Sequence, residues 1–271
     1  MNNSDVRIHY RVEGTGPPLV LMHGRFVSSE IHYSIGTVEA LRERHRLIMI
    51  DARGHGRSDK PHEPESYRMD SLVGDVTTVL DELGIGKTHY FGYSMGGRTG
   101  LGMAKYAPER LTSLIIGGYA GKDPDPAHPD EFHERMTQRL RMGRETWVSD
   151  VRAMVQAEMQ TAEKPSLVEG FAPMILQSQF DPQAFIAQMT WEQKECMRMA
   201  DVLPRLSLPC LMLVGEADAQ FEGARAASRL IPNARFVSFP GLRHIETMMR
   251  LDMLLPPILA FLSEVDGCLK A

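Results

Sequence analysis

The sequence has few cysteines and no long apolar run. Its three cysteines, Cys196, Cys210 and Cys268, lie far apart with no metal-ligand spacing, and their odd number argues against a disulfide framework. A reducing compartment therefore suits the chain best. No apolar stretch reaches the roughly 20 residues that span a bilayer, and residues 1–5 carry neither a basic region nor an apolar core. We expect no membrane segment, no signal peptide and a cytoplasmic location.

The sequence also lacks an excess of positive charge. Its 30 Lys and Arg are outnumbered by 35 Asp and Glu, which gives a formal net charge of -5, and there is no basic run. Electrostatics therefore offer no case for nucleic-acid binding. No His-x-x-x-His pair or His/Asp cluster indicates a metal, so we expect neither a metal nor a cofactor. The 271 residues, 43% of them hydrophobic, suffice for one large α/β domain with an insertion.

Short apolar runs alternate with helical patterns along most of the chain. Strands are predicted at Val6–Val12, Leu19–Met22, Leu47–Ile50, Thr88–Phe91, Leu111–Ile116, Leu211–Val214 and Ala234–Phe239. Helices are predicted at Thr37–Arg44, Met69–Leu83, Arg98–Tyr106, Phe221–Leu230 and Thr247–Leu262, the last interrupted or started late by Pro256 and Pro257. Most of the runs are continuously apolar, which is typical of strands buried on both faces. The rhythm predicts an α/β fold with a mostly parallel sheet, right-handed crossovers and flanking helices.

This rhythm breaks after Tyr119. Residues 121–130 are rich in Pro and Asp and have the character of a hinge, and residues 131–203 are helical in pattern without β runs. Both tryptophans, Trp147 and Trp191, lie in this stretch. We therefore expect a core domain formed by residues 1–119 and 204–271, with residues 120–203 inserted as a helical cap.

One stretch, Gly92-Tyr93-Ser94-Met95-Gly96-Gly97, lies between a predicted strand and a predicted helix. In that context Gly-x-Ser-x-Gly is the pattern of a nucleophile elbow, a sharp turn that exposes the serine hydroxyl. Gly92 and Gly96 carry no Cβ, so strand and helix can approach closely there. The stretch predicts Ser94 as a nucleophile.

A nucleophilic serine needs a base within hydrogen-bond reach and a third group that orients the base. In open α/β sheets such residues collect beyond the carboxyl ends of strands. His244 follows the last predicted strand and is the candidate base. Asp218 is the first candidate for the acid, ahead of Glu216 and Asp123, although Asp218 could equally cap the following helix. The order Ser, Asp, His is the one expected for this sheet type.

The oxyanion would be held by backbone N–H groups. We assign these to Met95, which follows Ser94 at a helix N-terminus, and to Arg25, in the loop after His23-Gly24. Each donor can supply about 3 kcal/mol of transition-state stabilisation. For the Arg25 side chain, an ion pair with an acid such as Glu30 or Asp218 is favoured over binding an anionic substrate group.

The remaining histidines need an assignment as well. His23 is expected to hold the oxyanion loop, and His55 is expected to stabilise its own loop. The others are predicted to be surface, loop or cap residues, namely His9, His32, His45, His62, His89, His128 and His133.

Taken together, these motifs resemble those of the α/β-hydrolase fold superfamily over nearly the whole chain. The resemblance is carried by His23-Gly24, by the loop Asp51–Pro61, by the elbow Gly92–Gly97, by Gly215–Asp218 and by His244. It implies that Arg53 braces the elbow region. Serine at the elbow points away from epoxide hydrolases and haloalkane dehalogenases, which use a carboxylate there. Arg243 and Arg25 depart from the family pattern, in which these positions are often Gly and a small or aromatic residue.

The resemblance implies a hydrolase of carboxylic esters that uses Ser94, Asp218 and His244, with lactones, including acyl-homoserine lactones, as further candidate substrates. Carbon–carbon bond hydrolysis, perhydrolysis and lyase chemistry are alternatives on the same triad, and a non-catalytic binding protein is another. A small-molecule substrate and a monomer or homodimer are expected, with neither a nucleic-acid nor a membrane partner. Candidate pocket residues are Tyr93, Trp147, Trp191 and Met189, although most apolar cap residues will build the core of the cap itself.

Overall fold

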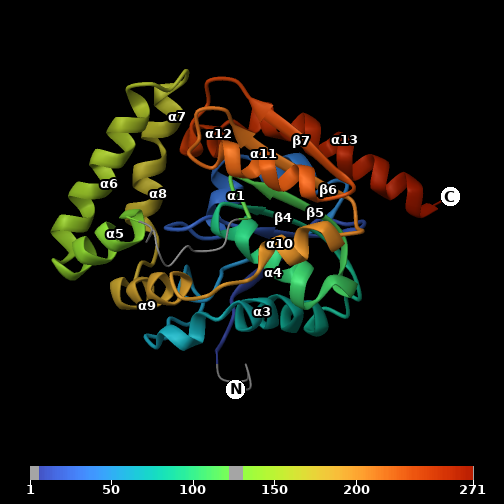
Figure 1. Cartoon of the computed structure of the whole chain (residues 1–271), viewed down its shortest axis with the longest axis horizontal. Helices are drawn as coiled ribbons and strands as arrows, with labels where there is room; N and C mark the ends of the chain where they lie inside the picture. The colour runs from blue at the N-terminus through green and yellow to red at the C-terminus, as the bar shows by residue number, and fades with distance from the viewer. Residues whose placement is uncertain (1–5, 122–130, 271) are drawn as a thin grey trace.

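The computed structural model describes residues 6–121 and 131–270 (Figure 1). Its strands are β1 (Tyr10–Glu13), β2 (Pro18–Met22), β3 (Arg46–Ile50), β4 (Thr88–Tyr93), β5 (Leu111–Gly117), β6 (Cys210–Gly215) and β7 (Ala234–Phe239). They form one sheet in the order β1-β3-β2-β4-β5-β6-β7. Only the β1–β3 pairing is antiparallel among the described strands. The predicted α/β class with a mostly parallel sheet is confirmed.

Helices cover both faces of this sheet. Successive side chains of a strand point to opposite faces, so Val20 and Met22 of β2 join one apolar cluster and Leu19 and Leu21 join another. The first cluster includes residues of α3 (Met69–Glu82), α4 (Met95–Tyr106) and α11 (Phe221–Leu230), and the second includes residues of α2 (Thr37–Leu41) and α13 (Leu251–Lys270). Burial on both faces explains why the strand sequences are continuously apolar.

Two predicted elements differ from the structure. The first strand begins at Tyr10 rather than Val6, because the backbone of residues 7 and 9 bonds to the loop after β3: Asp59 N–H donates to Arg7 O at 3.0 Å, and Asp51 N–H donates to His9 O at 2.9 Å. The closing helix breaks at Arg250, between α12 (His244–Met249) and α13, and not at the prolines. Both prolines lie inside α13, where each omits one backbone bond without ending the helix.

Between β5 and β6 the chain is helical, as its pattern predicts. The helices are α5 (Glu131–Arg141), α6 (Arg144–Met159), α7 (Pro165–Glu169), α8 (Phe171–Gln177), α9 (Pro182–Glu192) and α10 (Met199–Val202). In Figure 1, α5 to α8 stand to one side of the sheet and α9 lies beneath them. They pack onto the core through an apolar cluster in which Trp147, Val151 and Phe185 meet Tyr93 and Ile245. The insertion therefore contacts the edge of the sheet at which β4 ends.

In the part of the chain that the structure describes, no helix combines the length and the apolar character needed to cross a lipid bilayer.

Candidate active site

Ser94 stands in a strained turn between β4 and α4. Its φ of 54° and ψ of -113° lie outside the regions that a non-glycine residue normally adopts. Tertiary bonds maintain this geometry: Ser94 N–H donates to Gly117 O at 2.7 Å, and Arg98 N–H donates to Ser94 O at 3.0 Å. Such strain persists only where the surrounding structure enforces it, and it clusters at functional sites. The strand-turn-helix context that the motif requires is present.

The glycines on either side of Ser94 allow three segments to meet. A Cβ on Gly92 would lie 2.2 Å from the carbonyl oxygen of Gly96, and a Cβ on Gly96 would lie 2.3 Å from that of Met22. Both distances are far inside van der Waals contact, so only glycine fits at these two positions. Without side chains there, α4 packs directly against β4 and the end of β2, which brings Ser94 close to the His23-Gly24 loop.

His244 and Asp218 reach Ser94 from two other segments. His244 is the first residue of α12, and its Nε2 lies 3.0 Å from Ser94 Oγ. Its Nδ1 lies 2.7 Å from Asp218 Oδ2, in the loop that follows β6. With Nδ1–H donating to the carboxylate, the Nε2 lone pair faces the serine hydroxyl and can accept its proton. The structure thus brings the three predicted residues together in hydrogen-bond contact.

Burial differs sharply between the members of this group. The Asp218 side chain is 2% exposed, whereas that of His244 is 33% exposed. Asp218 Oδ1 also accepts the N–H of Gln220 at 2.9 Å, just before α11. The Asp218 carboxylate therefore both binds the imidazole and bonds to the backbone just before α11. Asp218 can thus be the acid beside His244 and also help to begin the helix, so the two predictions do not exclude each other. The imidazole remains reachable from solvent.

The other two acid candidates have different positions. Glu216 is exposed, and its Oε1 accepts a hydrogen bond from Ser238 Oγ at 2.8 Å, on the neighbouring strand β7. Asp123 lies outside the described residues. Of the acids that the structure describes, Asp218 is the one bonded to His244.

The loop after β2 lies against Ser94. A Cβ on Gly24 would be 3.7 Å from Ser94 Cβ, which places the next residue, Arg25, beside the serine. Phe26 has a φ of 74°, a second strained non-glycine residue at this edge of the sheet. On the other side, Met95 is the first residue of α4, so its N–H has no acceptor within the helix. Arg25 and Met95 thus flank Ser94 as the oxyanion hypothesis requires.

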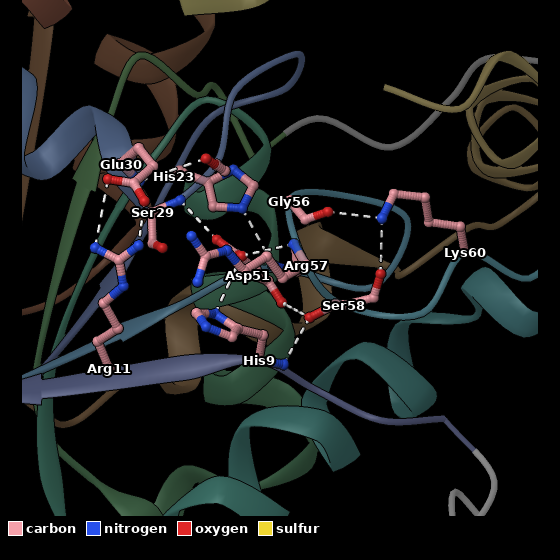
Figure 2. Close-up of polar contacts among 12 residues, drawn as sticks. His9, Arg11, His23, Ser29, Glu30, Asp51, Gly56, Arg57, Ser58 and Lys60 are labelled. Atoms are coloured by element: carbon pink, nitrogen blue, oxygen red, sulfur yellow. Dashed lines mark hydrogen bonds and ion pairs between the residues drawn. The ribbon is translucent and has the colours of Figure 1, made fainter. Parts of the chain in front are cut away.

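The His23 side chain bonds the loop after β2 to the loop after β3. Its Nδ1 lies 2.7 Å from Gly24 O, and its Nε2 accepts the N–H of Ala52 at 3.1 Å, so the two contacts require the neutral ring with the proton on Nδ1. Burial lowers the pKa of His23, which favours the same neutral form. Figure 2 shows Asp51 between Ser29, in the loop after β2, and Arg57, in the loop after β3. Its carboxylate accepts the N–H of Ser29 at 2.8 Å and the N–H of Arg57 at 2.9 Å. The expected role of His23 agrees with these contacts.

Three of the histidines assigned to surface, loop or cap positions are buried. His32 lies within α1 (Glu30–Ser34), His45 precedes β3, and His89 lies within β4. His89 bonds on both sides, to Ser113 Oγ at 2.8 Å and to Asp266 Oδ1 at 3.0 Å. The prediction was wrong for His32 and His89, whereas His45 does lie in a loop, although it is buried. An imidazole can be buried in its neutral form when it packs or bonds locally. His128 lies outside the described residues.

Arg53 binds a helix that packs against the helix of the elbow. Its Nε donates to Asp75 Oδ2 at 2.6 Å, and its Nη1 donates to Ser66 O at 2.6 Å. Asp75 belongs to α3, and α3 packs against α4, the helix that begins after Ser94. The bracing implied by the family resemblance therefore reaches the elbow through the contact between α3 and α4.

Arg25 forms an ion pair with an acid, as predicted, but the acid is not one of the two suggested. Its guanidinium binds Glu192 of α9, a residue that is almost fully buried. Glu30 pairs instead with Arg11. Glu192 is 167 residues from Arg25 along the chain, so no local sequence signal connects the two.

Helix α9 also contacts the residue on the other side of Ser94. Gln188, one turn before Glu192, donates from Nε2 to Met95 Sδ and to Glu192 Oε1, each at 3.1 Å. Arg98 of α4 pairs with Glu195 at 2.8 Å and lies 3.9 Å from Glu192. Through Gln188 and Glu192, α9 thus holds the side chains of both residues assigned to the oxyanion. Sequence reasoning missed this buried polar pair.

Replacing Glu192 with glutamine is expected to lower the free energy of unfolding by about 3 kcal/mol, because it removes the buried negative charge that binds the Arg25 guanidinium. Denaturant titration measures the change. Glu222→Gln is the matched control, since Glu222 pairs with Arg225 on an exposed helix surface and should contribute little. Equal stabilities of the two variants would show that the Arg25–Glu192 pair is not structurally important.

The four candidate pocket residues fall into two groups. Tyr93, Trp147 and Met189 share the apolar cluster between the insertion and the sheet edge. The ring centroid of Tyr93 lies 5.3 Å from that of His244, and its hydroxyl donates to His244 O at 2.8 Å. Trp191 instead packs with the cluster around α3 and α4, with the Arg68 guanidinium 5.9 Å from its ring. The structure brings the first three together and not the fourth.

Among residues 6–121 and 131–270, no group of three His, Cys, Asp or Glu side chains is placed to hold a metal ion.

Comparison with known proteins places this arrangement in a family. A sequence model described as alpha/beta hydrolase fold matches residues 17–245. The chain is 25% identical over 272 aligned positions to the "Putative carbamate hydrolase RutD" of Azorhizobium caulinodans, covering 98% of each chain. It is 26% identical to 3-oxoadipate enol-lactonase 2 of Acinetobacter baylyi, over 79% of this chain and 77% of that protein. Among solved structures, a thermophilic esterase from Thermogutta terrifontis superposes with a TM-score of 0.81 at 28% identity, covering 96% of this chain and 94% of the esterase.

Proposed function

The chain belongs to the α/β-hydrolase fold family, and on that premise we propose that it is a serine hydrolase that cleaves carboxylic esters, lactones included, through an acyl-enzyme on Ser94. The observation that carries the proposal is the pair of contacts made by His244, 3.0 Å to Ser94 Oγ and 2.7 Å to Asp218 Oδ2. A base placed between a serine hydroxyl and a buried carboxylate is the arrangement that activates serine as a nucleophile.

In the first half of the proposed reaction, Ser94 Oγ attacks the acyl carbon while its proton passes to His244 Nε2. Asp218 accepts the Nδ1–H hydrogen bond and stabilises the imidazolium that forms. The backbone N–H groups of Arg25 and Met95 bind the oxygen that becomes negatively charged. When the tetrahedral intermediate collapses, the bond to the leaving oxygen breaks and His244 gives its proton to that oxygen, which departs as an alcohol.

The second half releases the acyl group. His244 removes a proton from a water molecule, and the resulting hydroxide attacks the acyl carbon of the acyl-enzyme. The same two N–H groups hold the oxyanion, and collapse returns the proton from His244 to Ser94 Oγ. The products are a carboxylic acid and free enzyme. With a lactone substrate, the leaving hydroxyl is part of the acyl chain, so the product is a single hydroxy acid.

We assign residues 120–203 to a cap and residues 1–119 and 204–271 to the core domain. The apolar cluster that joins Trp147 and Phe185 to Tyr93 and Ile245 supports this division, because it packs the helical insertion beside Ser94 and His244. A cap in this place would decide which acyl and alcohol groups reach the serine.

Substrate profiling tests the proposal directly. Short acyl esters, five- and six-membered lactones, acyl-homoserine lactones and an alkyl carbamate are offered to the purified chain, alongside labelling of Ser94 by a fluorophosphonate. We expect labelling of Ser94 and turnover of esters or lactones. The carbamate arm is included because one relative is named as a carbamate hydrolase. Failure of Ser94 to react with the fluorophosphonate would overturn the mechanism, and turnover of the carbamate alone would replace the ester assignment.

A further inference from the structure

Helix α6 turns one stripe of side chains toward the core, and that stripe ends in a carboxylate. Trp147, Val151 and Val155 recur at helical spacing and are each less than 5% exposed. Glu158 continues the same face one turn later and is half-buried. An acidic residue at the end of an otherwise apolar, inward-facing stripe is unusual, because burying a charge is costly unless it has a partner.

This end of α6 is docked on the segment that carries His244. Thr161 follows Glu158 by less than one turn, its N–H donates to Glu158 O at 3.3 Å, and its hydroxyl accepts a hydrogen bond from Arg243 Nη1 at 3.1 Å. A few residues later, Lys164 N–H donates to Glu246 Oε1 at 2.8 Å. Two contacts on either side of His244 therefore hold the end of α6 against the start of α12.

The Glu158 carboxylate faces the same charges as the catalytic histidine. Burial raises its pKa, whereas the positive charges of Arg243 and protonated His244 oppose that rise, and Asp218 and Glu246 add to it. The negative charge of Glu158 also helps burial to raise the pKa of the Tyr93 hydroxyl, and this hydroxyl donates a hydrogen bond to His244 O. The carboxylate thus lies within electrostatic reach of the groups around His244.

Glu158 nonetheless lacks a partner of its own. Its Oε2 is buried and has no hydrogen-bond partner among the described residues. A buried acceptor left unsatisfied costs about 1–3 kcal/mol, and more when it is charged. An orphaned polar group of this kind beside a reactive histidine marks a position at which a ligand can supply the missing contact.

Two cations beside Ser94 already carry counter-charges within the protein. Arg25 binds Glu192, and Arg98 binds Glu195. Glu158 differs from them, because its Oε2 is a buried acceptor that no donor reaches within the part of the chain that the structure describes. A positively charged N–H group of a substrate is the donor that suits such an oxygen best.

We propose that Glu158 is a specificity residue that binds a protonated amine on the alcohol portion of an ester substrate, an inference that rests on the serine-hydrolase function proposed above. The alcohol portion is indicated because His244 must hand its proton to the leaving oxygen. A group a few bonds beyond that oxygen lies on the His244 side of the site, where Glu158 is held. The N–H of the protonated amine then donates a charge-assisted hydrogen bond to Glu158 Oε2, the oxygen that otherwise has no partner in the described structure.

Three acetate esters of similar size test the proposal: dimethylaminoethyl acetate, which is cationic at neutral pH, isopentyl acetate, its uncharged isostere, and β-acetoxypropanoate, which is anionic. We expect the native chain to show about tenfold higher kcat/KM for the cation than for the isostere, and its lowest value for the anion. Glu158→Gln should bring the first ratio close to one, because kcat/KM for the cation should fall about tenfold further than kcat/KM for isopentyl acetate. Glu145→Gln, on an exposed face of the same helix, should keep the native ratio.

Each other outcome is decisive. A ratio near one in the native chain, with isopentyl acetate hydrolysed, would overturn the role of Glu158 and leave the hydrolase function standing. An equal loss on all three esters in Glu158→Gln would show that Glu158 acts through His244 or through folding, and would also overturn it. If no ester is hydrolysed and Ser94 does not react with a fluorophosphonate, the hydrolase function itself fails.

Discussion

Replacing Ser94 with alanine should lower kcat for short acyl esters by about 10⁶-fold. The hydroxyl is the group that forms the acyl-enzyme, and no other side chain is hydrogen-bonded to His244 Nε2 among the described residues. Residual turnover above the uncatalysed rate would come from the oxyanion donors and from substrate binding alone. Steady-state kinetics on a chromogenic acetate ester measure the loss, and intact-protein mass spectrometry after fluorophosphonate treatment shows whether the adduct disappears with it.

Ser228→Ala is the matched control for this experiment. Ser228 lies on α11, and its hydroxyl donates to Arg225 O within the same helix, remote from the strained turn. That variant should keep native turnover and native labelling. Unchanged activity in Ser94→Ala would mean that the chemistry takes place elsewhere in the chain, and the strained geometry at Ser94 would then need another explanation.

The second large effect is expected at the acid. Asp218→Asn should reduce kcat by about 10⁴-fold, because a carboxamide can present an N–H to His244 and stabilise the tautomer whose Nε2 is already protonated. Such an imidazole can no longer accept the Ser94 proton. The imidazolium also loses the carboxylate that stabilises its charge, because asparagine is neutral. Kinetics across a range of pH and thermal unfolding separate this loss from a loss of folded protein.

Glu216→Gln serves as the comparison, because Glu216 follows the same strand but bonds to Ser238 on the exposed side. Its activity should stay within a few fold of native. Asp123→Asn completes the set, since the sequence alone leaves that position open. If either of these variants loses more activity than Asp218→Asn, then the acid has been assigned wrongly.

The sequence predicts the sheet and the three residues around Ser94 well, for local reasons. Leu19–Met22 and Leu211–Val214 are short, continuously apolar runs bounded by turn residues, which is typical of buried strands, and each leads into a loop that carries polar residues of the site. Parallel strands bring those residues to one edge. Ser94, Asp218 and His244 therefore follow from strand order and from the chemistry of side chains at strand ends.

Contacts across the insertion could not be predicted in the same way. Glu192 and Glu158 lie on helices whose polar residues are expected to face solvent, and only the packing against the sheet edge makes Glu192 buried and Glu158 half-buried. The partner of Arg25 depends on how α9 crosses the start of α4, a tertiary contact between residues 167 apart in the chain. The break between α12 and α13 at Arg250 could not be predicted for the same reason. The Arg250 guanidinium bonds to Asp252 nearby, but also to Glu163 of the insertion, which is 87 residues away in the chain.

The contacts of α9 bear on how this protein could be recombined with its relatives. Gln188 and Glu192 lie one turn apart on a single helix, and they hold residues on either side of Ser94. An inserted segment that lacks these two residues would remove both contacts at once. Exchange of residues 131–180 alone keeps them. The outer helices of the insertion can therefore be exchanged separately from α9, whereas α9 has to be kept together with the segments on either side of Ser94.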